Sequence, residues 1–364
     1  MNYIKYTIFS SLIFIGSLLI ADDGLAFKAK GKETIEVRFN GRMQAQYDGL
    51  SMHQSLEAGL PSDIDLNRTN HFYFRRLFFG AKAKLSNGIY AESVFDFAGD
   101  ESPEIAFDKA IIGYKFADGT TGAIGFQKVP FGFEETTSSS KLQTIERSAA
   151  NRFFADDIDF SSRHMGLHAK GKLGNGVSYA VAVVNSAQGE GSRLGGASNS
   201  SNDLASFYRL QYKQDNVTFG IDGGNQAENL VTGTDVSAYT TYVNYKAGGM
   251  DLLWEYFNGN LGAGNDTEGV SLRASMRNGK WEPVIRYSSV ESDWAIDSDE
   301  LIRRAPNGGG LGGQGSELDS KYIGLNYYYS KAVTFMAGYE DAESTNGIDT
   351  FTMDGLRARV QVLW

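Results

Sequence analysis

The feature that most constrains the fold is a two-residue period of hydrophobicity that recurs from one end of the chain to the other. Between residues 36 and 48, apolar or small residues alternate with polar ones at every position, and the last nine residues, 356–364, alternate in the same way except at Leu363. Successive side chains of a β-strand point to opposite faces, so this period predicts strands with one apolar and one polar face. An all-β protein is therefore expected.

The connections between these segments alternate in length. Short turn signals, several with Asn-Gly or Asp-Gly pairs that favour tight hairpins, occur near residues 86–88, 117–119, 174–176, 214–216, 247–249, 278–280 and 330–331. Longer polar connections centre near residues 49–67, 99–103, 129–160, 187–203, 227–233, 259–266, 292–319 and 342–349. Fifteen connections imply sixteen antiparallel strands. Short turns on one side and long loops on the other are typical of a transmembrane antiparallel β-barrel of the bacterial outer membrane, whose tilted strands need only about 10 residues each.

A soluble β-sandwich is the main alternative, because it would show the same alternation with the apolar face buried. Aromatic residues near the strand ends favour the barrel, since girdles of aromatic side chains mark both interfaces of a membrane barrel. These residues are Tyr114, Phe116, Tyr179, Tyr212, Tyr245, Trp254, Trp281 and Tyr287. The terminal Trp364, preceded by apolar residues at every second position, is also typical of the C-terminal assembly signature of outer-membrane barrels.

The N-terminus indicates export. Residues 1–26 have Lys5 at the start, an apolar stretch over residues 8–20 and a small-x-Ala cleavage site at Gly24-Leu25-Ala26. The alternative, a membrane anchor, would be short at about 13 apolar residues. We expect a cleaved signal peptide over 1–26, one barrel domain over 27–364, and a location in the outer membrane of a Gram-negative bacterium.

Composition excludes several functions. The 364-residue chain has no cysteine and a formal net charge of −10, which argues against disulfides, thiolate chemistry, most zinc or iron–sulfur sites and nucleic-acid binding. No apolar run beyond residue 20 approaches the roughly 20 residues of a membrane-spanning helix. His164 and His168, about 13 Å apart on a strand, are too distant to share a metal. No nucleophile motif is present, so we expect neither an enzyme, a metal nor a cofactor.

The parity of the strands predicts which side chains line the lumen. A charge on the lipid face costs about 2–4 kcal/mol at the bilayer midplane, so charged residues are assigned to the inner face. The basic residues assigned to the lumen and to anion binding are Arg38, Arg42, Arg76, Lys82, Lys84, Arg209, Arg273, Arg277, Arg357 and Arg359, with Lys170 and Arg286 on the same face. The acidic residues assigned inward are fewer: Glu36, Asp48, Glu92, Asp96, Asp222, Glu255, Glu282 and Glu340. A net-basic wall favours anion passage, unless opposite charges pair across strands and cancel.

The long connection after the fifth strand is the most distinctive segment. We expect 130–160 to fold inward and narrow the pore, because its phenylalanines, Phe131, Phe133, Phe153 and Phe154, can anchor it to the inner wall. The residues assigned to this constriction loop are Pro130, Phe131, Gly132, Glu134, Glu135, Lys141, Glu146, Arg147 and Arg152.

Four motifs and the aromatic terminus together resemble the phosphate-selective porin O/P family across essentially the whole mature chain. The motifs are Asn40-Gly41-Arg42, Phe74-Arg75-Arg76, Pro130-Phe131-Gly132 and Glu146-Arg147-Ser148. The resemblance implies a sixteen-stranded, usually trimeric porin, in which an arginine ladder guides phosphate to lysines at a constriction formed by the third loop. Arg42, Arg76 and Arg75 match ladder positions. The third loop departs from the family pattern, because residues 129–160 hold six acidic and three basic residues and no lysine cluster.

Three functions remain open from the sequence. The first is a diffusion porin for small hydrophilic solutes with a preference for anions, phosphate among them. The second is a cation-selective or nonselective porin of the same fold, in which the acidic third loop decides. The third is a barrel that serves as an adhesin or an enzyme. The expected partners are outer-membrane lipid, small anions such as phosphate, and two further copies in a homotrimer.

Overall fold

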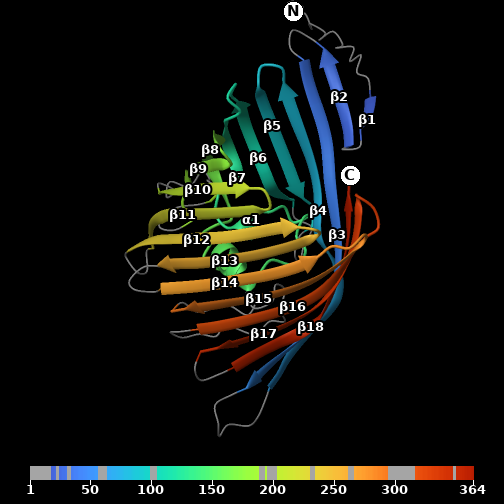
Figure 1. Ribbon diagram of the computed structural model, residues 1–364, viewed down its shortest axis with the longest axis vertical. Coiled ribbons are helices and arrows are strands. Elements are labelled where there is room, and N and C mark those ends of the chain that lie inside the picture. Colours follow the sequence, from blue (N-terminus) through green and yellow to red (C-terminus); the bar gives the residue numbers. More distant parts are fainter. Residues whose placement is uncertain are drawn as a thin grey trace, which may run out of the picture.

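The computed structural model describes residues 18–21, 24–30, 34–55, 64–98, 105–187, 193–194, 203–229, 234–260, 266–293, 316–346 and 350–364. The described residues form eighteen strands and three short helical segments (Figure 1). The strands are β1 (Leu18–Ala21), β2 (Gly24–Lys30), β3 (Thr34–Ser55), β4 (Ile64–Leu85), β5 (Ile89–Asp96), β6 (Ala106–Lys115), β7 (Thr121–Lys128), β8 (Arg163–Gly174), β9 (Val177–Asn185), β10 (Leu204–Gln214), β11 (Val217–Asn229), β12 (Thr234–Ala247), β13 (Met250–Asn260), β14 (Asp266–Met276), β15 (Trp281–Ser292), β16 (Ser316–Tyr328), β17 (Val333–Thr345) and β18 (Thr350–Leu363). The helical segments are α1 (Phe133–Thr136), α2 (Ala149–Arg152) and the π-helical η1 (Phe153–Asp157).

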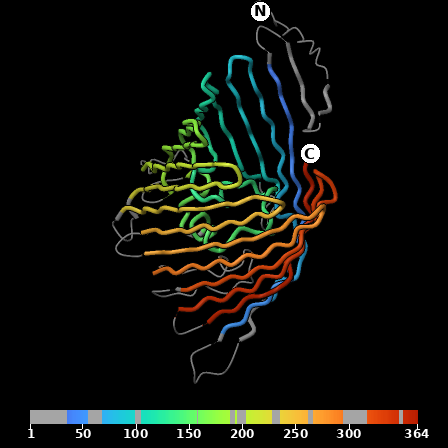
Figure 2. Tube along the Cα trace, in the orientation of Figure 1, coloured from blue at the N-terminus to red at the C-terminus, as the bar shows by residue number. Residues whose placement is uncertain are grey.

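The sixteen strands from β3 to β18 form one closed antiparallel barrel. Each strand pairs with the next in the sequence, and β18 pairs with β3 from Thr350↔Ser55 to Leu363↔Arg42. Figure 2 shows the same order, with the blue N-terminal strand beside the red C-terminal one. A closed barrel has no free sheet edge, which excludes the two packed sheets of a sandwich. The predicted sixteen-stranded barrel is confirmed.

The short turns follow the predicted chemistry. Asn175 and Asp215, in the turns after β8 and β10, have positive φ angles of 49° and 47°. Asn and Asp tolerate this left-handed conformation, which matches the twist of the flanking strands.

The first hairpin differs from the prediction. β3 and β4 each span 22 residues, so most of the predicted loop at 49–67 is strand. Leu50 and Met52 are almost fully buried, and Met52 lies opposite Met353 of β18. β3 extends because apolar residues on its inner face pack against β18. This contact joins residues far apart in the chain, so the mostly polar sequence of 49–67 does not predict it.

The predicted parity of the strands is confirmed by burial. On β13, Asp251, Leu253 and Glu255 are buried inside the barrel, whereas Leu252 and Trp254 are exposed on the outside. Aromatic side chains exposed on the outside of the barrel include Tyr114, Phe116, Tyr212, Trp254, Trp281 and Tyr287. The outer surface is therefore apolar and aromatic, as contact with lipid requires.

A bulge in β4 breaks the parity at Arg75. Gln44 pairs with Arg76 and Ala45 pairs with Phe74, which leaves Arg75 as an extra residue in the strand. Because a bulge sends two neighbouring side chains to the same side, both Arg75 and Arg76 are buried within the barrel. Strict alternation would have sent one of them to the lipid.

Part of the predicted signal peptide lies within the described residues. β1 and β2 pair with each other, and β2 pairs with the start of β3; residues 1–17 and 22–23 lie outside the described residues. Cleavage after Ala26 remains a prediction, and it would remove β1 and the first three residues of β2. Within the described part of the chain, no helix has the length and apolar character to span a membrane.

Candidate permeation site

The segment between β7 and β8 lies inside the barrel and is anchored at both ends by phenylalanines. Phe131 packs edge-on against Phe160 with 4.9 Å between ring centroids, and Phe154 stacks on Phe257 of β13 at 5.2 Å. These four rings are completely buried. The predicted inward fold of the third loop is therefore confirmed.

Wall carboxylates bind the backbone where the loop enters its first helical turn. Asp222 of β11 accepts a hydrogen bond from Gly132 N at 2.9 Å, and Glu255 of β13 accepts from Phe133 N and Glu134 N. Gly132 has a φ of 79°, a conformation that favours glycine. These bonds satisfy donors that a helix start leaves free, so two predicted inward acids hold the loop.

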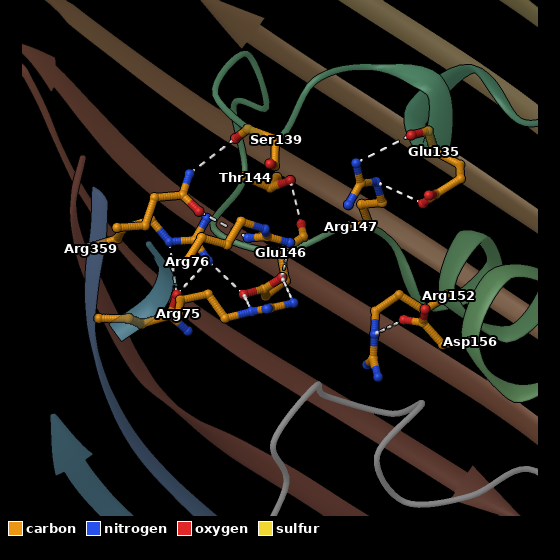
Figure 3. Close-up of polar contacts among 12 residues, drawn as sticks. Arg75, Arg76, Glu135, Ser139, Thr144, Glu146, Arg147, Arg152, Asp156 and Arg359 are labelled. Carbon is orange, nitrogen blue, oxygen red and sulfur yellow. Dashed lines mark hydrogen bonds and ion pairs between the residues drawn. The ribbon is translucent and has the colours of Figure 1, made fainter. Parts of the chain in front are cut away.

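Arg147 ties the loop to itself. Its guanidinium donates to the carbonyl oxygens of Glu134, Glu135 and Thr137, and lies 3.0 Å from the Glu135 carboxylate (Figure 3). Lys128 of β7 also pairs with Glu135. Burial raises the pKa of Glu135, but Arg147 and Lys128 outweigh burial and hold it below its ordinary value. Glu135 is therefore ionised and links Arg147 of the loop to Lys128 of β7.

Glu146 connects the loop to the wall through three arginines. Arg75 Nε lies 2.8 Å from its carboxylate, Arg359 Nη2 2.5 Å and Arg76 Nη2 3.9 Å (Figure 3). Burial alone would raise the pKa of Glu146, but Arg75, Arg359 and Arg76 hold it well below its ordinary range. The carboxylate is therefore a charged anchor.

A second ionic network lies in the wall itself. Arg357 of β18 contacts Asp48 at 3.0 Å and Glu340 at 3.1 Å, and Arg286 of β15 contacts Glu340 at 2.5 Å. All four side chains are buried. These arginines pair with carboxylates on neighbouring strands. This is the alternative stated for the lumen, in which opposite charges pair across strands and cancel.

The remaining predicted basic residues are either paired with a carboxylate or exposed. Arg209 pairs with Asp222, and Arg273 lies 3.3 Å from Asp251. Lys82 pairs with Glu92, and Arg38 pairs with Glu36. Lys84 and Lys141 are exposed.

The sequence also assigns Arg277 to the lumen, and this assignment stays a prediction. β14 ends at Met276, so Arg277 lies in the following turn, where it is exposed and stacks on Tyr328 at 3.8 Å.

A cavity of about 1080 Å³ lies between the loop and the wall formed by β3 to β8. Its basic lining residues are Arg42, Arg75, Arg76, Lys109, Lys128, Arg147, Arg152 and Arg163. Its acidic lining residues are Glu92, Asp96, Asp108, Glu135, Glu146 and Asp156. Eight basic and six acidic residues leave a formal surplus of two positive charges.

The sequence reasoning missed Lys109, Lys128 and Arg163. Asp108 is an extra residue at a bulge between β5 and β6, which shifts the parity on its N-terminal side. Further along β6, Ile111 and Ile112 are consecutive, so the alternation does not show which face of the strand is apolar. Lys128 and Arg163 flank the loop and could have been assigned inward from their positions at its two ends.

Comparison with known proteins supports the architecture. The family model described as phosphate-selective porin O and P matches residues 37–161. No curated protein matches. Among solved structures, an anion-selective porin from Comamonas acidovorans aligns with a TM-score of 0.63 at 12% identity over 91% of this chain and 100% of that chain. OmpF of Salmonella typhi, solved with daunomycin, aligns with a TM-score of 0.62 at 14% identity over 90% and 98% of the two chains. The DcaP channel of Acinetobacter baumannii gives 0.62 at 10% over 91% and 97%.

These findings define the class. The chain is an outer-membrane porin-type β-barrel of a Gram-negative bacterium, with its third loop folded into the lumen. The resemblance to the phosphate-selective porin O and P family is confirmed over residues 37–161. Fold and family match indicate a channel rather than an enzyme.

Proposed function

We propose that this barrel is a passive diffusion porin that favours small anions. The observation that carries the proposal is the cavity between the loop and the β3–β8 wall, whose charged lining has a surplus of basic residues. Low-dielectric walls focus the field of such a surplus and raise the local anion concentration. Arginine suits this role because its guanidinium stays charged and matches oxyanions in a bidentate way.

Phosphate is the specific anion we propose, in line with the description of the matching family. Arg42 supports it, because this side chain lines the cavity and its Nε has no hydrogen-bond partner among the described residues. The guanidinium also lies over the Phe78 ring at 4.3 Å, which fixes its orientation. A nonselective or cation-selective porin is the second candidate, favoured by the six acidic residues in the same cavity.

We also propose a homotrimer embedded in outer-membrane lipid. The structural neighbours include a trimer form of OmpT from Vibrio cholerae, with a TM-score of 0.53 at 13% identity over 91% of this chain and 99% of that chain. Cross-linking of the purified barrel in detergent tests this directly: a ladder ending at three subunits supports the proposal, and a monomer alone contradicts it.

Reversal potential in a planar bilayer under a salt gradient tests the selectivity. An anion-selective sign is expected at low salt, and the selectivity should fall towards 1 M salt, where the screening length is about 3 Å. A cation-selective sign at low salt would overturn the proposal in favour of the second candidate. A barrel that forms no channel at all would favour an adhesin or an enzyme.

A further inference from the structure

The ends of the third loop are held by buried phenylalanines as well as by polar bonds, whereas its middle is held mainly by polar bonds. The ends pack through the buried phenylalanine cluster described above. The middle, residues 137–147, is held mainly by polar bonds: Gln44 donates to Ser139 O at 3.3 Å, Gln361 to Ser140 O at 3.1 Å and Asn326 to Gln143 O at 2.8 Å. Ile145, buried with Val284, Tyr322 and Met336, is its main apolar contact. The middle of the loop is therefore sensitive to competing charges.

The ionic contact at Glu146 is unbalanced. Three guanidinium groups, from Arg75, Arg76 and Arg359, share one carboxylate. Arg76 and Arg359 make their other bonds to the uncharged amide oxygens of Gln44 and Gln46. All four charged side chains are at least nine-tenths buried. Buried charge is costly unless it is paired, so the net charge of +2 favours binding of a further anion.

The unbalanced cluster is accessible from the cavity. Arg75, Arg76 and Glu146 all line it, together with Arg42 and Arg147. An anion that enters the cavity therefore meets Arg75 and Arg76, two of the three arginines that Glu146 already binds; the third, Arg359, does not line the cavity. A carboxylate and a phosphate present similar oxygen pairs to a guanidinium, so the two can compete for the same donors.

We propose that Glu146 is a tethered counter-anion, which occupies an oxyanion position formed by Arg75, Arg76 and Arg359 and is displaced by a doubly charged oxyanion from solution. The proposal rests on the anion-preferring pore proposed above. A divalent anion compensates three positive charges better than one carboxylate does. Its binding would release the middle of the loop, while the phenylalanine-anchored ends stay in place. Glu146 is thereby an autoinhibitory contact. It sets the anion concentration at which the middle of the loop is released from the wall.

Block of the chloride current by inorganic phosphate at pH 7.5 tests the proposal in single channels. Glu146→Gln keeps the shape and hydrogen-bonding oxygen of the side chain but removes the competing charge. We expect the half-blocking phosphate concentration to fall at least fivefold in this variant. The matched control is Glu340→Gln, which removes an equally buried, arginine-paired carboxylate that does not line the cavity; its half-blocking concentration should stay within twofold of wild type.

Unchanged block in Glu146→Gln, or an equal shift in Glu340→Gln, would overturn the proposal. If Glu146→Gln fails to assemble, Glu146→Asp serves instead, because the shorter side chain withdraws the carboxylate and keeps its charge. A shift in the same direction of at least twofold is then expected, and no shift overturns the proposal. The reversal potential of the wild-type channel reports on the proposed function separately, since its sign does not depend on comparing the variants.

Discussion

At the scale of single residues, the arginines of the inner wall have two roles that their identical chemistry does not reveal. Arg357 is fully buried between Asp48 and Glu340 and makes a structural contact. Arg42 faces the cavity and lies over Phe78. The distinction depends on which carboxylates the register brings within reach.

Replacing Arg357 by methionine should therefore destabilise the barrel. The change leaves two buried carboxylates without their guanidinium, and breaking a buried pair from one side costs about 3–5 kcal/mol. Denaturant unfolding of the folded barrel in detergent measures the loss. Arg277→Met is the control, because Arg277 is exposed in a turn, and its unfolding midpoint should stay near that of wild type. Equal stability of both variants would contradict the structural role of Arg357.

Acid should abolish the stabilising contribution of Glu146. The pKa of this carboxyl lies well below its ordinary value of 4.5, chiefly because its three arginines outweigh the opposing effect of burial. A group whose pKa is lower in the folded state stabilises the fold above its unfolded pKa and loses that effect as pH falls through the folded one. Wild type should exceed Glu146→Gln in unfolding free energy at pH 7, and the gap should close well below pH 4.5. A gap that persists unchanged into strong acid would contradict the ionic anchor.

At the scale of elements, the third loop is the part that converts a barrel into a constricted pore. Its ends are fixed by aromatic packing, as between Phe154 and Phe257. Its middle reaches the wall through Gln44, Asn326 and Gln361. This division lets the loop fill part of the lumen and still leave the cavity beside β3 to β8.

Deleting residues 138–145 should raise the single-channel conductance, because it removes a stretch of the loop that borders the cavity at Ser138–Ser140 and spares both aromatic anchors. Single-channel recording in 1 M salt measures the increase. Shortening the connection at 347–349, which joins β17 to β18, is the control and should leave conductance unchanged. A deletion that leaves the conductance at the wild-type value would mean that ions pass elsewhere.

At the scale of the whole molecule, charge is distributed unevenly. The chain has a formal net charge of −10, yet the cavity has more basic than acidic lining residues. Selectivity follows the charges that border the aqueous path and is little affected by those beyond a screening length of about 10 Å in 0.1 M salt.

Replacing both Arg42 and Lys109 by glutamine should therefore lower the anion preference. The two changes remove the formal surplus of positive charge from the cavity, so the reversal potential at low salt should move towards zero or change sign. The difference from wild type should shrink at 1 M salt, where screening is strong. Arg277→Gln with Lys280→Gln is the control, since both residues are exposed in the turn after β14. An equal shift in the control pair would attribute selectivity to net charge and not to the cavity.

The sequence by itself determined the barrel, because the two-residue period of hydrophobicity in each strand distinguishes its inner face from its outer face. The fifteen connections, the lipid-facing residues and the inward third loop with its phenylalanines all follow from local patterns. The tertiary structure alone decided what local patterns cannot encode. The bulges at Arg75 and Asp108 shift the parity, and Arg277 lies beyond the end of its strand. Above all, the register of β18 against β3 and the seating of the loop select which carboxylate each arginine meets. Ion pairing depends on distances between residues far apart in the chain, so the charges could be assigned to the inner face from the sequence, but their partners could not.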